Sequence, residues 1–252
     1  MEIKQNDNYF SIPNLFTLGN LLCGCLAIVY AFEGFLYVSS ILVIIASVLD
    51  FLDGFMARIL KQSSAIGQQL DSLADMVTFG VVPSVILYQL LSQAFYTGDG
   101  LIFGLNAGMF PKLGFLIALF SALRLAKFNI DTRQTKGFLG LPTPANAIFW
   151  IGLPLIEHYE VASFAKPIVT LLLQPETMVV FVLLLSFLLI SEIKMFSLKV
   201  TSFSFKENIL VYVFLAASLV LLISLSFLAL PIIIVLYIIL SIISSTFLRK
   251  TQ

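Results

Sequence analysis

Long apolar runs separated by short polar segments dominate the chain. A bilayer-spanning helix needs about 20 apolar residues. Eight runs approach or exceed that length, at residues 14–32, 36–60, 70–96, 110–128, 142–158, 175–194, 207–230 and 232–248. The connections at 61–69, 97–107 and 129–140 are more polar, and 167–173 is a half-length apolar piece. The pattern predicts an all-α integral membrane protein, a bundle of eight transmembrane helices.

Composition agrees with a membrane location. The 252 residues are 60% hydrophobic and only 11% charged, whereas soluble domains carry about 25% charged residues. The formal net charge is zero, so we expect no nucleic-acid partner. Cys23 and Cys25 show no metal-ligand spacing and are expected to pack as small apolar side chains.

The basic residues give the predicted helices an orientation. If the N-terminus is cytoplasmic, alternation of the eight helices places twelve of the 14 Lys and Arg residues inside, and only Lys112 and Lys166 outside. This bias is what the positive-inside rule expects. We therefore predict that both termini are cytoplasmic. The inside set is Lys4, Arg58, Lys61, Arg124, Lys127, Arg133, Lys136, Lys194, Lys199, Lys206, Arg249 and Lys250.

One acidic stretch interrupts the apolar pattern. Residues 50–75 read DFLDGFMARILKQSSAIGQQLDSLAD. Asp50 and Asp53 are three residues apart, and Asp71 and Asp75 are four apart, so each pair shares one face of a helix. Ionisable groups inside a membrane mark functional sites by default. We expect two neighbouring helices to aim four carboxylates at one point, below the cytoplasmic surface.

Four carboxylates in a low-dielectric site need compensating cations. Oxygen-only ligands suit Mg2+ or Mn2+. In the alternative, the charges are buried pairs that only fix helix packing, but the single nearby Arg58 cannot neutralise four acids. We therefore predict a divalent-metal site made by Asp50, Asp53, Asp71 and Asp75.

The same stretch resembles the signature of the CDP-alcohol phosphotransferases. The matching pattern is Asp50-x2-Asp53-Gly54-x2-Ala57-Arg58-x8-Gly67-x3-Asp71-x3-Asp75, without a gap or substitution. The resemblance implies a six-helix core, here within residues 1–200, with two further helices at 201–252 in the same domain. It implies that two ions of Mg2+ or Mn2+ are held by the aspartates, with Asp75 also the general base. It implies that the CDP moiety is bound by Asp53, Gly54, Ala57, Arg58 and Gly67.

Three further runs resemble the bacterial phosphatidylserine synthases of this family. They are residues 12–20 (IPNLFTLGN), 124–129 (RLAKFN) and 138–145 (FLGLPTPA). The resemblance implies CDP-diacylglycerol and L-serine as substrates, phosphatidylserine and CMP as products, and a bacterial inner membrane location with the active site on the cytoplasmic side. Two alternatives stay open: another alcohol acceptor, such as glycerol phosphate or inositol, and a cation transporter.

Four polar residues outside the signature are candidates for the same site. Asn14 and Thr17 share a face of the first helix and are expected to line the nucleotide pocket, with an N-cap role for Asn14 as the alternative. Arg124 and Lys127 are expected to bind the lipid phosphate or serine, with ordinary positive-inside anchoring as the rival.

His158, the only histidine, falls on the outer side, away from the acids. The last two helices carry no buried charge and are predicted to be scaffold or the surface of a homodimer.

Overall fold

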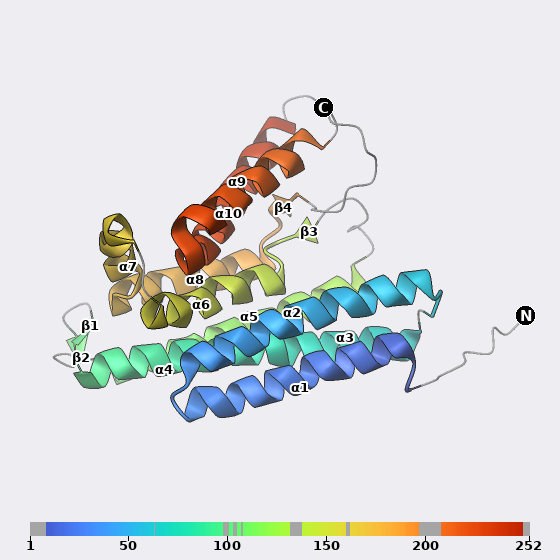
Figure 1. The fold of residues 1–252 in the computed structure, drawn as a ribbon, viewed down its shortest axis with the longest axis horizontal. Coiled ribbons are helices and arrows are strands. Elements are labelled where there is room, and N and C mark those ends of the chain that lie inside the picture. The colour runs from blue at the N-terminus through green and yellow to red at the C-terminus, as the bar shows by residue number, and fades with distance from the viewer. Residues whose placement is uncertain are drawn as a thin grey trace, which may run out of the picture.

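The computed structural model describes residues 9–62, 64–97, 101–102, 105–106, 108–131, 138–159, 162–196 and 208–248. Within them the chain is almost entirely helical (Figure 1). The α-helices are α1 Ile12–Phe32, α2 Leu36–Ile59, α3 Ala65–Asp75, α4 Val82–Thr97, α5 Leu116–Ile130, α6 Thr143–His158, α7 Lys166–Leu172, α8 Pro175–Ile190, α9 Ile209–Leu225 and α10 Ala229–Leu248. Short helical pieces are η1 Met76–Val81, η2 Phe110–Phe115, η3 Ser163–Ala165 and η4 Ser226–Leu228.

Four two-residue strands complete the described part of the chain. β1 (Leu101–Ile102) pairs antiparallel with β2 (Leu105–Asn106). β3 (Phe138–Leu139) pairs antiparallel with β4 (Lys194–Met195), with Phe138 opposite Met195. The second pair joins segments 55 or more residues apart and lies between the main bundle and the C-terminal helices (Figure 1).

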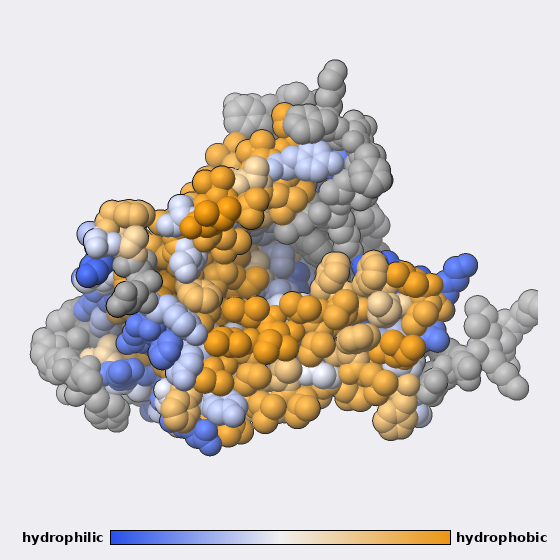
Figure 2. Space-filling model, in the orientation of Figure 1, coloured by the Kyte–Doolittle hydropathy of each residue, from blue (hydrophilic) through white to orange (hydrophobic). Residues whose placement is uncertain are grey.

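The prediction of an all-α integral membrane protein is confirmed, whereas the count of eight helices is not. Among the described residues, five helices are long and apolar enough to span a bilayer, or six if the bent pair α7–α8 counts as one span. Figure 2 shows an apolar band over the middle of the helices and hydrophilic residues gathered at the ends. The count falls short of eight because α6 has only 16 residues and because α9 to α10 count as one 37-residue helix.

Helix α6 lies in the core of the bundle. Phe149, Trp150 and Ile151 are each at most 1% exposed, so successive positions are buried all round the helix. A helix that is apolar on every side is a buried helix. Its packing is close: a Cβ on Gly152 would come within 2.9 Å of Pro231 on α10. The burial explains why this short segment is as apolar as a membrane span.

The third predicted helix begins earlier than its apolar pattern indicated. We expected a polar connection through residue 69 with the acids in the first turns of the next helix. Instead α3 starts at Ala65, where the Ser64 side chain caps it by accepting from the Gly67 amide at 3.0 Å. Asp71 therefore lies almost two turns inside the helix. The polar residues of 65–70 hid this start because they face outward from a short amphipathic segment.

The C-terminal helices also break at a different place. The sequence placed the break at Pro231, but α9 ends at Leu225 and Ser226 takes the left-handed φ of 52°. Pro231 instead lies in the first turn of α10, where its missing N–H costs no helical hydrogen bond. Helices α9 and α10 then contact each other as a hairpin above α6 and α8 (Figure 1).

Gly140 fixes the loop that leads from β3 into α6. Its φ is +78°, and its amide donates to the Ile193 carbonyl at 2.9 Å. A Cβ at this position would lie 2.5 Å from the Leu189 carbonyl oxygen and 2.9 Å from that of Ser191. Only glycine fits so close to two backbone carbonyls in a left-handed conformation.

Gly140→Ala should therefore destabilise the protein. Strained backbone of this kind costs about 1–3 kcal/mol, and the steric clash adds to it. Thermal unfolding of the detergent-purified variant measures the loss. Gly108→Ala is the matched control, because a Cβ there meets nothing within 4 Å. Equal melting temperatures for the two variants would contradict the close packing at Gly140.

Candidate active site

Three of the four signature carboxylates converge between α2 and α3. Asp50, Asp53 and Asp71 each offer an oxygen that lies within 4.8 Å of the other two. Asp53 is buried, whereas Asp50 and Asp71 are half-buried. The convergence follows from the helix spacing: the i, i+3 pair on α2 faces the third acid across the α2–α3 turn.

Asp75 lies next to this group, at the last position of α3. It interacts electrostatically with Asp50, Asp71 and Asp53, but it is not one of the three whose oxygens converge. Its Oδ1 is buried and has no hydrogen-bond partner among the described residues. The chain then continues as the π-helix η1, a form that is rare and often marks functional sites.

Helix α1 contributes Thr17 and Asn14. The Thr17 hydroxyl donates to Asp53 Oδ2 at 2.7 Å, which places it in the aspartate cluster. Asn14 is buried one turn before it, and its Nδ2 donates to the Tyr9 carbonyl. The alternative that Asn14 caps α1 is wrong, because Ser11 is the N-cap residue and accepts from the Asn14 amide.

Close packing between α1 and α3 is enough to explain why position 67 is a glycine, with no ligand needed. A Cβ on Gly67 would meet Asn14 Oδ1 at 3.0 Å and Ser64 Oγ at 3.1 Å. The small residue therefore lets α3 approach α1 near the start of both helices. Its predicted contact with CDP stays a prediction.

The remaining nucleotide candidates line the end of α2. Arg58 is exposed, and its Nη1 lies 3.9 Å from where a Gly54 Cβ would be, so the guanidinium folds back over Gly54. Ala57 is half-buried beside it. Together these residues leave an open shelf with one planar cation, which suits phosphate oxygens.

Arg124 reaches the site from α5. The side chain is only 7% exposed, and its Nη1 donates to Thr143 Oγ1 at 3.2 Å. The guanidinium carbon lies 5.5 Å from the centre of the Phe128 ring. It also interacts electrostatically with Asp75, which brings this predicted residue and the acids together. Its Nε has no hydrogen-bond partner among the described residues, so one buried donor faces away from Thr143.

Lys127 behaves differently from Arg124. Its Nζ forms an ion pair with Glu192 Oε1 at 3.4 Å, with the Lys127 side chain 36% and the Glu192 side chain 68% exposed. Exposed ion pairs contribute about 0–1 kcal/mol, so this pair adds little stability. Nearby, Asn129 Nδ2 donates to Ser72 Oγ at 2.9 Å and joins the end of α5 to α3. The sequence did not predict the contacts of Thr143, Glu192 and Ser72. Of these three residues, only Thr143 could have been singled out from the sequence, because it lies in the 138–145 run.

The donor set fits a divalent cation. An uncompensated Asp at the centre of a membrane helix costs about 2.5–3.5 kcal/mol, so four acids on membrane helices need positive charge nearby. Arg58 and Arg124 supply two positive charges against four carboxylates, which leaves an excess of negative charge. The converging oxygens of Asp50, Asp53 and Asp71, with the unpartnered Oδ1 of Asp75 next to them, are ligands of the kind that Mg2+ and Mn2+ take in proteins.

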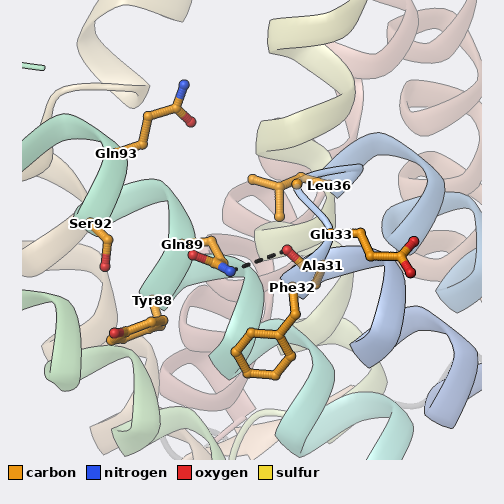
Figure 3. Close-up of a pocket in the computed structure, with 9 residues that line it drawn as sticks. Ala31, Phe32, Glu33, Leu36, Tyr88, Gln89, Ser92 and Gln93 are labelled. Carbon is orange, nitrogen blue, oxygen red and sulfur yellow. Dashed lines mark hydrogen bonds between the residues drawn. The ribbon is translucent and has the colours of Figure 1, made fainter. Parts of the chain in front are cut away.

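A separate cavity of about 390 Å³ lies at the far end of α1. Ala31, Glu33, Tyr88, Gln89 and Ser92 are among its lining residues, and Gln89 Nε2 donates to the Ala31 carbonyl (Figure 3). Thr17 and Ala31 are fourteen residues apart on one helix, or about 21 Å. This cavity is therefore distinct from the aspartate site.

His158 is also remote from the acids. Its ring stacks on Tyr37 with centroids 3.7 Å apart, in the first turn of α2. Asp50 lies thirteen residues further along the same helix, about 20 Å away. The expectation that the only histidine has no part in the acidic site agrees with this placement.

Comparison with known proteins identifies the chain's relatives. The model of the CDP-alcohol phosphatidyltransferase family matches residues 10–243. A CDP-diacylglycerol–serine O-phosphatidyltransferase of Helicobacter pylori is 34% identical over 212 residues, covering 82% of this chain and 81% of the relative. One of Bacillus subtilis is 39% identical, covering 53% and 69%. An archaetidylserine synthase of Methanothermobacter thermautotrophicus is 30% identical, covering 66% of each chain. The protein belongs to the CDP-alcohol phosphatidyltransferase family.

Proposed function

We propose that the protein transfers the phosphatidyl group of CDP-diacylglycerol to the hydroxyl of L-serine, giving phosphatidylserine and CMP. The relatives from Helicobacter pylori and Bacillus subtilis carry this activity in their names. The observation that carries the proposal is the convergence of Asp50, Asp53 and Asp71 with Asp75 beside them. A soluble amino acid would reach the acids from the cytosol and the lipid substrate from the bilayer.

Asp50, Asp53, Asp71 and Asp75 would hold the divalent ions, which we propose to be two Mg2+ or Mn2+. Bound there, the ions would neutralise negative charge on phosphate oxygens. Thr17 keeps one Asp53 oxygen oriented through its hydrogen bond. Gly54, Ala57 and Arg58 would receive the CDP moiety, with Arg58 binding phosphate oxygens and the two small residues leaving space for the nucleotide.

Asp75 would act as the general base. It would take the proton from the serine hydroxyl, whose oxygen then forms a bond to the phosphatidyl phosphorus. The bond from that phosphorus to the CMP oxygen breaks, and CMP departs with the electron pair. The buried Oδ1 of Asp75 has no partner among the described residues, so it is available to accept a proton. Arg124, which interacts electrostatically with Asp75, would bind the lipid phosphate or the serine carboxylate.

Two alternatives were left open by the sequence. Membership in a family of phosphatidyltransferases argues against the cation transporter. A different acceptor alcohol remains the second candidate, because the converging acids would serve glycerol phosphate or inositol equally well. Several relatives are named as serine O-phosphatidyltransferases, which favours serine as the acceptor.

A purified-protein assay tests the proposal. The protein in detergent–lipid micelles receives CDP-diacylglycerol with Mn2+ or Mg2+, and CMP release is followed with L-serine, glycerol 3-phosphate and myo-inositol in parallel. We expect rapid release only with serine, and none after removal of divalent ions with a chelator. Release with another alcohol but not with serine would contradict the acceptor.

We further propose eight transmembrane helices, with both termini and the aspartates on the cytoplasmic side of the bacterial inner membrane. In this arrangement α6 crosses the bilayer at the centre of the bundle, and α9 and α10 each cross the bilayer once. Residues 1–200 then form the six-helix core, and 201–252 add the hairpin within the same domain. Ser226, with its left-handed φ, supports a reversal of the chain between α9 and α10.

A reporter fusion tests the topology. Alkaline phosphatase, which is active only outside the inner membrane, should stay inactive when fused after Gln252. The same enzyme inserted after Gly108, which this topology places outside, should be active. An active C-terminal fusion would place the C-terminus outside and so contradict an even number of transmembrane helices. The expected homodimer stays a prediction, because lipid would cover the exposed apolar faces of α1 and α9 equally well.

A further inference from the structure

The π-helix η1 follows Asp75 directly and sets the direction of that residue relative to α4. The Val82 amide donates to the Val77 carbonyl five residues earlier. An α-helix closes the same turn over four residues, so η1 holds one extra residue. One inserted residue rotates the helix before it against the helix after it by about 100°. The direction of Asp75 relative to the buried helix α4 therefore depends on η1 keeping this form.

Helix α1 contacts η1 through a hydrogen bond and a glycine. The Thr78 side chain is fully buried, and its hydroxyl donates to the Asn20 carbonyl at 3.2 Å. One turn further along α1, a Cβ on Gly24 would lie 2.5 Å from Thr78 Oγ1 and 3.3 Å from Thr78 Cα. A methyl group would fit there only if the hydroxyl moved away from the Asn20 carbonyl. Gly24 therefore permits the close approach on which this hydrogen bond depends.

Helix α5 contacts η1 as well. A Cβ on Gly80 would lie 3.2 Å from Ser121 Cβ and 3.2 Å from Met76 Sδ, so η1 and α5 are in close contact. Ser121 is one turn before Arg124 on α5. Thus η1 touches both α1, which carries Thr17, and α5, which carries Arg124.

Helix α1 also links the two pairs of acids. Thr17 donates to Asp53 Oδ2 on α2 at 2.7 Å. One turn later on α1, the Asn20 carbonyl accepts from Thr78, which is itself one turn after Asp75. The position of Asp75 relative to Asp53 is therefore set through α1, by two hydrogen bonds one turn apart.

We propose that Thr78 is a positioning residue for the reaction: its hydrogen bond to Asn20, permitted by Gly24, holds η1 against α1 and so directs the Asp75 carboxylate at the acceptor hydroxyl. The inference rests on the proposed function, in which Asp75 is the general base. Asp75 Oδ1 has no hydrogen-bond partner among the described residues, so the backbone of α3 and η1 aims that oxygen.

Thr78→Val is the first test, because it removes the hydroxyl and keeps a β-branched side chain of similar size. A misplacement of about 1 Å can cost about 100-fold, so we expect kcat at saturating substrates to fall at least about tenfold. The Kd for CDP-diacylglycerol, titrated without serine, should stay within about threefold of wild type, because the proposed nucleotide shelf is on α2. Thr78→Ser keeps the hydroxyl and should keep kcat within about threefold.

Gly24→Ala tests the same contact from α1. The added methyl would displace the Thr78 hydroxyl without removing it. We therefore expect the same pattern, with kcat lowered at least about tenfold and the Kd for CDP-diacylglycerol within about threefold of wild type. A kcat within about threefold of wild type in this variant would overturn the inference.

Gln89→Met is the matched control. Gln89 on α4 also donates to a carbonyl of α1, that of Ala31, at the same 3.2 Å and across the same 58 residues as the Thr78 bond (Figure 3). It is fourteen residues from Asp75, about 21 Å along the helix. Its loss should lower the melting temperature, as Thr78→Val does, but leave kcat within about threefold of wild type.

A double variant asks whether Thr78 acts through Asp75. In an Asp75→Asn background, Thr78→Val should lower the remaining turnover by less than about threefold, because it then positions a group that no longer takes the proton. A further loss of about tenfold would show that the hydroxyl acts on something other than the base, and would overturn the inference.

The remaining outcomes separate the inference from the proposed function. If wild-type protein releases CMP with serine and Thr78→Val keeps its kcat, the inference is overturned while the proposed function stands. Equal losses of kcat in Gln89→Met and Thr78→Val also overturn it, since loosening α1 anywhere would then be enough. If wild-type protein binds CDP-diacylglycerol but releases no CMP with serine, the proposed function fails, and the inference fails with it.

Discussion

Asp50→Asn and Asp71→Asn should each lose nearly all CMP release. Both carboxylates belong to the group whose oxygens converge within 4.8 Å, and an amide keeps the shape but removes the charge that would hold a divalent ion. Changing even an outer partner of a metal ligand costs about 10–100-fold, so losing a ligand should cost more than about 100-fold. CMP release at saturating Mg2+ or Mn2+ measures the loss.

Two further measurements separate a lost ion from a misfolded protein. Titration with Mn2+ should show weaker binding in both variants, and melting in metal-free buffer should be unchanged or higher, because mutual repulsion of the acids falls. Glu33→Gln makes the same chemical change at the far end of α1 and should leave ion binding and CMP release intact. Near-wild-type turnover in either aspartate variant would show that the cluster is not the metal site.

The acid spacing was enough to predict that Asp50, Asp53 and Asp71 converge, because they lie on regular helices, but Asp75 lies beside this group instead of within it. Asp50 and Asp53 face inward from α2 in a fixed i, i+3 relation, and the short α2–α3 turn allows little freedom in where Asp71 lies. The start of α3 was less predictable. Gly67, Gln68 and Gln69 interrupt the apolar pattern near its start, so hydrophobic periodicity failed there, although the capping Ser64 was a usable signal.

Contacts between distant segments could not be predicted from one sequence. Glu192 pairs with Lys127 across 65 residues, and the Tyr237 hydroxyl donates to the Phe196 carbonyl across 41 residues. No periodic pattern encodes such pairs, since each residue alone resembles ordinary membrane-protein sequence. Helix α6 is a further case: its apolar run predicts a span whether lipid or protein surrounds it, and only packing distinguishes the two.

Asp75→Asn should abolish CMP release while CDP-diacylglycerol still binds. Asp75 lies one turn after Asp71, beside the three converging acids, and its buried Oδ1 has no hydrogen-bond partner among the described residues. A serine hydroxyl is a poor nucleophile at neutral pH, so a positioned base should contribute about 10²–10⁴-fold. An amide cannot accept the proton, and the variant should therefore lose turnover by that factor.

Arg58→Ala provides the contrast that makes the Asp75 result specific. Arg58 belongs to α2 and folds over Gly54, on the proposed nucleotide shelf. Its loss should weaken CDP-diacylglycerol binding and kcat/KM together, whereas Asp75→Asn should separate binding from turnover. Titration of each purified variant with CDP-diacylglycerol, beside the CMP assay, measures both quantities. If Asp75→Asn turns over within a few-fold of wild type, the proton must leave through another group, and Asp75 is then neither the base nor an essential metal ligand.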